Sequence, residues 1–240
     1  MPKLPEVTRM TKRITNHLSR SDAVMAGLIG AAGPYELVPE LEWTLFRALA
    51  RAISHQQLHA NAANAILKRF IDSCGKGDFP TPEEVLAAPK KTMRAAGFSL
   101  AKIAALKDLA KKTLEGVVPE RAHLGEIDDA EIIARITQVR GIGRWTVEMM
   151  LMFQLGRPDV LPVDDFGVRT GFRLTYGLRK MPPPRALAAF GERWKPHRTA
   201  AAWYLWRAVD LSRAGKLPAP CERIRLPRIK RRTARPKLAK

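Results

Sequence analysis

Cysteine is scarce in this chain of 240 residues, which contains only Cys74 and Cys221. Two thiols cannot supply a four-thiolate zinc or iron–sulfur site, and they do not suggest a disulfide-stapled secreted domain. Long apolar runs are also missing, because charged residues interrupt each stretch before it reaches the ~20 residues that span a membrane. The basic N-terminus lacks the apolar core of a signal peptide. These absences predict a protein without membrane contact, located in the cytoplasm with the nucleoid, or in a eukaryotic nucleus.

Acidic residues are few: 23 Asp and Glu stand against 42 Lys and Arg, for a formal net charge of +19. Such an excess favours a polyanionic partner, most often nucleic acid, over a basic protein with no specific polyanion. The segment 223–240 carries nine basic residues and no acid, which leaves +10 for residues 1–222. We interpret residues 1–222 as one domain of two lobes and residues 223–240 as a basic disordered tail, either DNA-binding or merely solvated.

Alternating strand patterns and internal repeats are absent as well, whereas apolar residues recur at helical spacing along most of the chain. The sequence therefore predicts an all-α fold of two helical lobes with a central cleft. Asp128 or Asp129 is expected to cap one helix, and Asp164 another. The expected helices cover residues 41–54, 56–74, a start at 82, 100–116, 130–139, 144–155, 165–176, 185–194 and 198–214.

A glycine-rich hairpin joins two of these helical patterns at residues 139–144. Gly141 and Gly143 permit a tight turn and a close approach of the backbone to a ligand. Arg144 then opens an apolar helix, whose first N–H groups form an anion site suited to phosphate. The alternative is a tight turn between packed helices, but the large positive charge favours phosphate binding.

Two adjacent carboxylates, Asp164 and Asp165, follow in this otherwise basic chain. Negative charge near phosphate opposes binding, so the pair indicates chemistry. One carboxylate could stabilise positive charge developing on a deoxyribose or orient an attacking water. The alternative for either residue is an ordinary helix N-cap.

Residues 139–169 resemble the helix-hairpin-helix DNA glycosylase superfamily, and GIGRWTVEMMLMF followed by LPVDDF resembles its 3-methyladenine DNA glycosylase II branch. Three further segments are similar to that branch: AISHQQLHANAANAI to its helix with paired glutamines, GFSLAKIAAL to its base-wedge segment, and WKPHRTAAAWYLW to its C-terminal signature. Together they cover roughly residues 40 to 210.

The resemblance implies two helical lobes, extrusion of a damaged nucleotide from duplex DNA, and cleavage of its N-glycosidic bond. By residue-to-residue match it makes Asp165 the catalytic aspartate, with Asp164 the neighbouring cap, and Leu100 the wedge that fills the gap in the duplex. The base pocket that it implies consists of Trp145, Met149, Phe166 and Trp206, and the DNA-binding set of Leu100, Gly141, Gly143, Arg144 and Thr146.

Trp145 separates the branches of the superfamily, and Met149 is a departure from some of its members. Trp145 stands where bifunctional relatives carry a lysine, so no Schiff-base lyase step is expected, and Met149 replaces a tyrosine found in some members. The four-cysteine cluster of the endonuclease III and adenine-mismatch branches is absent. The alternative for the large aromatic residues is ordinary core packing.

The expected function is therefore monofunctional excision of alkylated purines, with 3-methyladenine and 7-methylguanine as substrates, in base excision repair. Purines methylated at N3 or N7 are cationic and leave easily, while aromatic walls hold them by stacking and cation–π attraction. A glycosylase for an oxidised or deaminated base and a non-catalytic helix-hairpin-helix DNA-binding protein remain alternatives. We expect a monomer with no organic cofactor and no catalytic metal, and the resemblance allows a structural monovalent cation at the hairpin.

Two minor features have an ordinary explanation beside a functional one. His55 and His59 are spaced like metal ligands, but Gln56 stands where a zinc protease needs glutamate, so no metal is expected. Gln56 or Gln57 either faces the cleft or belongs to a polar helix face, and His197 and Arg198 either contact phosphate or face solvent.

Overall fold

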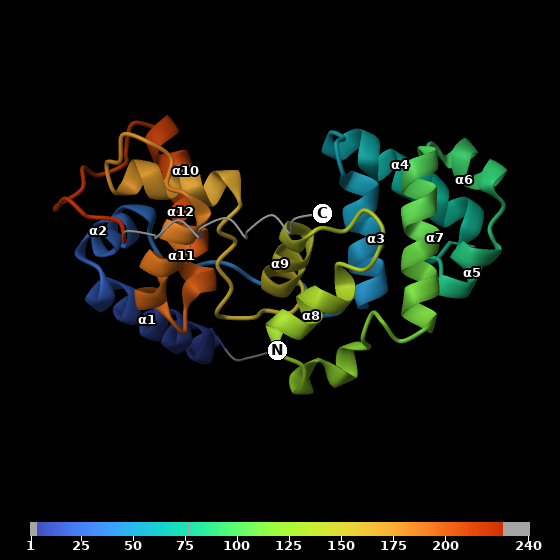
Figure 1. Cartoon of the computed structure of the whole chain (residues 1–240), viewed down its shortest axis with the longest axis horizontal. Helices are drawn as coiled ribbons and strands as arrows, with labels where there is room; N and C mark the ends of the chain where they lie inside the picture. The colour runs from blue at the N-terminus through green and yellow to red at the C-terminus, as the bar shows by residue number, and fades with distance from the viewer. Residues whose placement is uncertain (1–3, 76, 228–240) are drawn as a thin grey trace, which may run out of the picture. The chain divides into compact units, whose positions relative to one another are not determined.

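The chain is described by a computed structural model, which places residues 4–75 and 77–227. These residues form helices and connecting segments and contain no strand (Figure 1). The all-α class is thus confirmed for them. The chain divides into two compact units, one of Met1–Leu37 with Pro158–Lys240 and one of Val38–Arg157. The proposed tail lies outside the described residues from residue 228 onward.

The first unit is built around aromatic side chains on its C-terminal helices. Phe172, Phe190 and Trp194 are buried and pack edge to face. Gly171 has no side chain, so the backbone of α10 lies directly against the backbone of Leu205 in α12. The helices of this unit are α1 (Leu4–Ser21), α2 (Ala23–Ala32), α10 (Phe166–Thr175), α11 (Pro184–Gly191) and α12 (Arg198–Arg213), with a short 3₁₀ turn, η2 (Glu192–Trp194).

The second unit is organised around α7 (Leu100–Leu114), which packs against α3 (Leu45–His55) and α5 (Pro82–Ala87) (Figure 1). Its core includes Phe70 and Phe98, which are fully buried and meet edge to face. The remaining elements are α4 (Ala60–Cys74), α6 (Lys90–Ala96), η1 (Arg121–Glu126), α8 (Asp129–Ile136) and α9 (Arg144–Phe153).

Local sequence explains where several helices begin. Ser99 caps α7 by accepting a hydrogen bond from the Lys102 amide. Thr81 and Glu84 form a reciprocal capping box around Pro82 at the start of α5. Of the two expected candidates for the cap of α8, Asp128 is the one whose side chain accepts from the helix, at the Glu131 amide.

Three expectations about helix boundaries are wrong. The helix expected from residue 41 begins only at Leu45, after its cap Thr44. The cap of α10 is Asp165, not Asp164, and the helix begins at Phe166. The helix expected from residue 56 begins only at Ala60, because residues 56–59 form a turn in which Gln57 has a φ of 57°. The helices α1, α2 and α6 were not expected from the sequence pattern.

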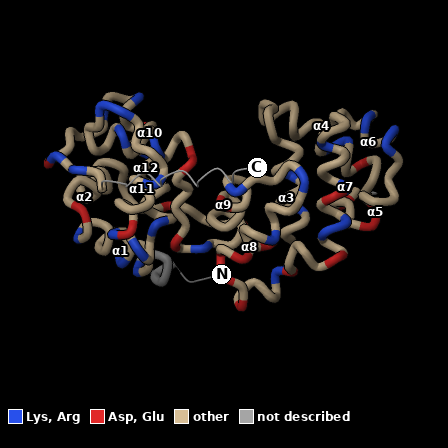
Figure 2. Tube along the Cα trace, in the orientation of Figure 1, with Lys and Arg blue, Asp and Glu red and all other residues tan. Residues whose placement is uncertain are grey.

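Many basic side chains donate hydrogen bonds to main-chain carbonyls inside their own unit. On α7, Lys102 bonds to the Ser54 oxygen near the end of α3, Lys107 to the oxygens of Leu86 and Ala88 at the end of α5, and Lys112 to the Gln138 oxygen after α8. Cations near helix C-termini complement the helix dipole. Lysines and arginines occur along both units (Figure 2), and part of this charge therefore stabilises the fold.

Within the described residues, no helix is both long enough and apolar enough to cross a membrane.

Candidate active site

The carboxylate of Asp165 is fixed at the start of α10 by two donors on a single oxygen. Its Oδ1 atom accepts from the Val168 amide at 2.7 Å and from the Trp206 indole Nε1 at 2.8 Å. Trp206 belongs to α12, so the pairing of α10 with α12 sets the orientation of the carboxylate. Because the donors are rigid parts of two packed helices, the Asp165 side chain is held in one rotamer.

The residues beside Asp165 differ in exposure. Asp164 is exposed and takes no part in the cap, whereas Asp165 is half-buried. The Phe166 side chain, next in sequence, is 74% exposed and therefore does not pack in the core. The first unit thus brings together three residues that the sequence singled out: a fixed carboxylate, an exposed aromatic ring and a half-buried indole.

The predicted hairpin lies between α8 and α9 in the second unit. Gly141 has a φ of 78°, which favours glycine, whereas Gly143 has a φ of −96° that any residue adopts. Of the two positions, only Gly141 therefore has a backbone conformation that favours glycine. Gly143 is the N-cap of α9 and has no side chain with which to accept from the first amides of the helix. This end of α9 is suited to an anionic ligand.

Arg144 opens α9 as expected, and its guanidinium is oriented by a partner one turn further on. Its Nε atom lies 2.7 Å from Oε1 of Glu148, whose side chain is 4% exposed, while the arginine side chain is 63% exposed. A buried carboxylate thus holds an arginine at the hairpin surface.

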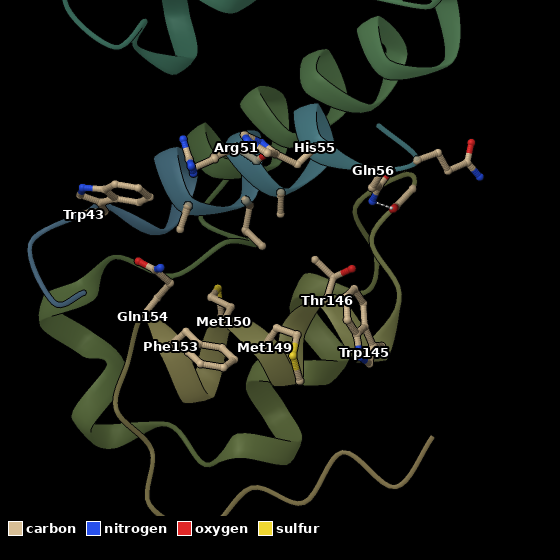
Figure 3. Close-up of a pocket in the computed structure, with 15 residues that line it drawn as sticks. Trp43, Arg51, His55, Gln56, Trp145, Thr146, Met149, Met150, Phe153 and Gln154 are labelled. Atoms are coloured by element: carbon tan, nitrogen blue, oxygen red, sulfur yellow. Dashed lines mark hydrogen bonds between the residues drawn. The ribbon is translucent and has the colours of Figure 1, made fainter. Parts of the chain in front are cut away.

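A cavity of about 640 Å³ lies between α3 and α9 in the second unit (Figure 3). Trp145, Thr146 and Met149 line it from α9, and Arg51 and His55 from α3. Trp145 is 51% exposed, so it is not a core residue. Of the expected base-pocket residues, Trp145 and Met149 share this cavity, and Phe166 and Trp206 lie with Asp165 in the other unit.

Leu100 is the first residue of α7, and its side chain is 66% exposed. The alternative of a core leucine at a helix start is therefore wrong. An exposed leucine on a rigid, capped helix has the placement that a wedge requires.

The minor features differ in their roles. His55 bonds through Nε2 to Asn64, and no group of three metal-ligating side chains occurs in the described part of the chain. Arg198 forms ion pairs with Asp159 and Glu192, so its guanidinium is not simply facing solvent. Gln56 and Gln57 follow the end of α3, so they do not belong to a helix face, and both line the cavity. The Gln56 Nε2 atom donates to the Gly141 oxygen in the hairpin at 3.0 Å (Figure 3).

The sequence analysis did not identify several residues of the cavity. Trp43, Phe153 and Gln154 line its far end, and Arg51 lies over the Trp43 ring at 5.5 Å. Phe153 follows Trp145 and Met149 at helical spacing, so the apolar stripe of α9 could have identified it. Trp43 precedes its helix, and no local pattern marks it.

These features define a helix-hairpin-helix protein with a fixed carboxylate at a helix start. The model of the HhH-GPD superfamily of base excision DNA repair proteins matches residues 50–197, and the chain belongs to this family.

Among proteins of known name, the chain is similar to DNA-3-methyladenine glycosylase 1 of Schizosaccharomyces pombe, with 42% identity over 207 residues that make up 86% of this chain and 90% of that protein. It is 32% identical to the alkylbase DNA glycosidase-like protein mag2 of the same organism, over 85% of this chain and 97% of the relative. Among solved structures, the Schizosaccharomyces pombe 3-methyladenine DNA glycosylase in complex with abasic DNA matches with a TM-score of 0.73 and 41% identity, covering 83% of this chain and 98% of that one.

Proposed function

We propose that this protein is a monofunctional DNA glycosylase that hydrolyses the N-glycosidic bond of alkylated purines, 3-methyladenine and 7-methylguanine, flipped out of duplex DNA. The observation that carries the proposal is the Asp165 carboxylate, held by Val168 and Trp206 at the start of α10. The family membership and the names of the relatives support the same activity.

Hydrolysis of this bond requires little catalysis from the protein beyond one carboxylate. An alkylated purine is a cationic leaving group, so its departure needs little acid catalysis. The purine leaves as a neutral base with the bonding electron pair, so the positive charge passes to the sugar. Asp165 stabilises this charge until water adds to C1′ and loses a proton to solvent. Trp145, at the position where bifunctional relatives carry lysine, supplies no amine for a lyase step. Trp145 and Met149 line the cavity of the second unit with an apolar wall and one aromatic face, which is the kind of surface that holds a cationic purine.

The hairpin supplies DNA affinity in this proposal. The amides at the start of α9 bind one phosphate without reading the sequence, and Arg144 and Thr146 flank them. Leu100 fills the space that the extruded nucleotide leaves. The partner is double-stranded DNA with an alkylated base, which the protein binds as a monomer. Its location is the cytoplasm with the nucleoid or, in a eukaryote, the nucleus.

The proposed reaction has no organic cofactor and no catalytic metal. A monovalent cation at the hairpin carbonyls would have a purely structural role. Two of these oxygens already accept a hydrogen bond, Val139 from the Ile142 amide and Gly141 from Gln56. No step of the proposed reaction depends on such a cation.

Chromatography of the bases released from methylated duplex DNA tests the function directly. We expect free 3-methyladenine or 7-methylguanine, and an unbroken strand at the abasic site because no lyase step occurs. If no alkylated base is released while DNA binding persists, the same assay on duplexes with oxidised or deaminated bases separates another lesion specificity from a binding-only protein. Strand scission in step with base release would contradict the monofunctional assignment.

Trp206→Phe should slow base release at least about tenfold, because the carboxylate loses a donor while an aromatic ring remains. A hydrogen bond to a charged group contributes about 1.5–3 kcal/mol, and 1.4 kcal/mol corresponds to a factor of ten in rate. The measurement is the single-turnover rate at saturating enzyme, with affinity for abasic duplex followed in parallel. Trp203→Phe is the matched control, since Trp203 lies on the same helix and contacts Tyr35 and Tyr204. Equal rates for the two variants would show that the indole does not position Asp165.

A further inference from the structure

The ion pair of Asp108 and Lys112 on α7 forms hydrogen bonds with the main chain at the start of the hairpin. Oδ2 of Asp108 accepts from the Arg140 backbone amide at 2.7 Å and from Lys112 Nζ at 2.6 Å. The same ammonium donates to the Gln138 oxygen at 2.7 Å. Two side chains one turn apart on α7 thus hold the main chain on both sides of Val139, directly before Gly141.

The Asp108–Lys112 pair is less exposed to solvent than the neighbouring ion pair on α7. The side chains of Lys112 and Asp108 are only 21% and 26% exposed, whereas the Lys111–Glu115 pair on the same helix is 65% and 49% exposed, at 3.6 Å. Burial by itself would raise the pKa of Asp108, but the hydrogen bonds from Lys112 and from the Arg140 amide and the charges of Lys112 and Lys111 lower that pKa below its ordinary value. Asp108 is therefore ionised throughout the neutral range, and the contact is intact there.

The hairpin needs such an anchor, because its ligand contacts are backbone amides. An amide changes its direction whenever the chain rotates, and Gly141 has no side chain to limit that rotation. The Gly141 Cα lies close to α7, where an added Cβ would be 3.5 Å from that of Ala105. α7 also begins with the exposed Leu100, about 12 Å from Asp108 at 1.5 Å per residue. One rigid helix thus carries the wedge residue and the anchor of the phosphate-binding turn.

We propose that Asp108, together with Lys112, is a positioning residue for DNA binding: it fixes the hairpin turn on α7, so that the phosphate-binding amides and Leu100 engage the same duplex together. This inference rests on the proposed function of the hairpin and the wedge. It assigns Asp108 no contact with the DNA and no part in bond cleavage.

The sign of the effect separates this proposal from simple electrostatics. Asp108→Ala and the control Glu115→Ala both remove one negative charge from α7, so general attraction to DNA should rise equally in both. We expect Asp108→Ala instead to weaken binding to a duplex with a stable abasic-site analogue about tenfold, and Glu115→Ala to bind at least as tightly as the wild type. Asp108→Asn keeps an acceptor for the Arg140 amide and should recover part of the loss.

Base release supplies the readout that a merely structural role would not give. In single turnover, the enzyme concentration for half-maximal rate should rise with the loss of affinity, while the rate at saturation stays within twofold of the wild type. Equal affinity of Asp108→Ala and Glu115→Ala would overturn the proposal, as would a loss at saturation that matches the loss of affinity. If Asp108→Ala fails to fold, the near-isosteric Asp108→Asn carries the test, with weaker binding than Glu115→Ala expected. The affinity measurements need no cleavage, so they stand even if the wild type releases no alkylated base.

Discussion

Asp165→Asn should reduce release of alkylated bases by at least about a hundredfold, while the affinity for abasic duplex does not fall. Loss of one electrostatic stabiliser of a charged transition state typically costs 10²–10³ in rate. The amide is nearly isosteric with the carboxylate, and its oxygen can still accept from the Val168 amide and the Trp206 indole. Because asparagine is also a good N-cap, α10 should keep its start and the variant its melting temperature.

Asp164→Asn is the matched control for this experiment. It removes the same charge one residue earlier, from an exposed side chain that takes no part in the cap. We expect base release close to the wild-type rate. The opposite result, with release lost in Asp164→Asn and kept in Asp165→Asn, would transfer the catalytic role to Asp164. Loss of DNA binding in Asp165→Asn would instead indicate a structural role.

Gly171→Ala should destabilise the first unit by about 3 kcal/mol or more, at or beyond the upper end of the usual overpacking cost. A Cβ atom at this position would lie 1.8 Å from the Leu205 oxygen and 2.5 Å from its carbonyl carbon, both of which are backbone atoms. Relief therefore requires α10 and α12 to move apart. Urea unfolding followed by far-ultraviolet circular dichroism measures the loss as a lower midpoint.

Moving α10 and α12 apart should also disturb the candidate active site, because Trp206 directly follows Leu205 and donates to Asp165. Any folded Gly171→Ala protein should therefore release bases more slowly than the wild type. Gly30→Ala provides the control, since a Cβ there meets nothing within 4 Å and the residue lies inside α2. That change should stabilise by about 0.5–1 kcal/mol through helix propensity. A Gly171→Ala protein as stable as the wild type would contradict the close packing of α10 on α12.

The sequence predicted best those parts of the fold and site that depend on neighbours in the chain. The starts of α7 at Leu100 and of α9 at Arg144 follow from Ser99 and Gly143 immediately before them. Asp165 could likewise be recognised as one of two candidate caps, but the choice between adjacent aspartates depends on which side chain turns toward the Val168 amide. That choice depends also on Trp206, which is 41 residues away along the chain.

Among the helices that the sequence did not predict, α2 lacks a clear apolar period. The sequence of α2, AVMAGLIGAA, is apolar on every side and contains two glycines, so no stripe distinguishes its buried face. The turn at residues 56–59 contains no glycine or proline from which it could be predicted. Its Gln56 side chain bonds to Gly141 across 85 residues, which is a partnership that only the folded chain creates.

The basic side chains that bond to main-chain carbonyls also affect the thermodynamics of the complex with DNA. A protein cation releases a condensed counterion only when it neutralises a phosphate. Three lysines instead donate hydrogen bonds to carbonyl oxygens at helix ends: Lys102, Lys107 and Lys112. Arg121 donates likewise to the carbonyl oxygens of Trp43 and Gln154. Beyond about 10 Å at 0.1 M salt, the attraction of such charges for DNA is largely screened. We therefore expect the number of ions released on DNA binding to be smaller than the formal charge of +19 suggests, because part of that charge is engaged within the fold.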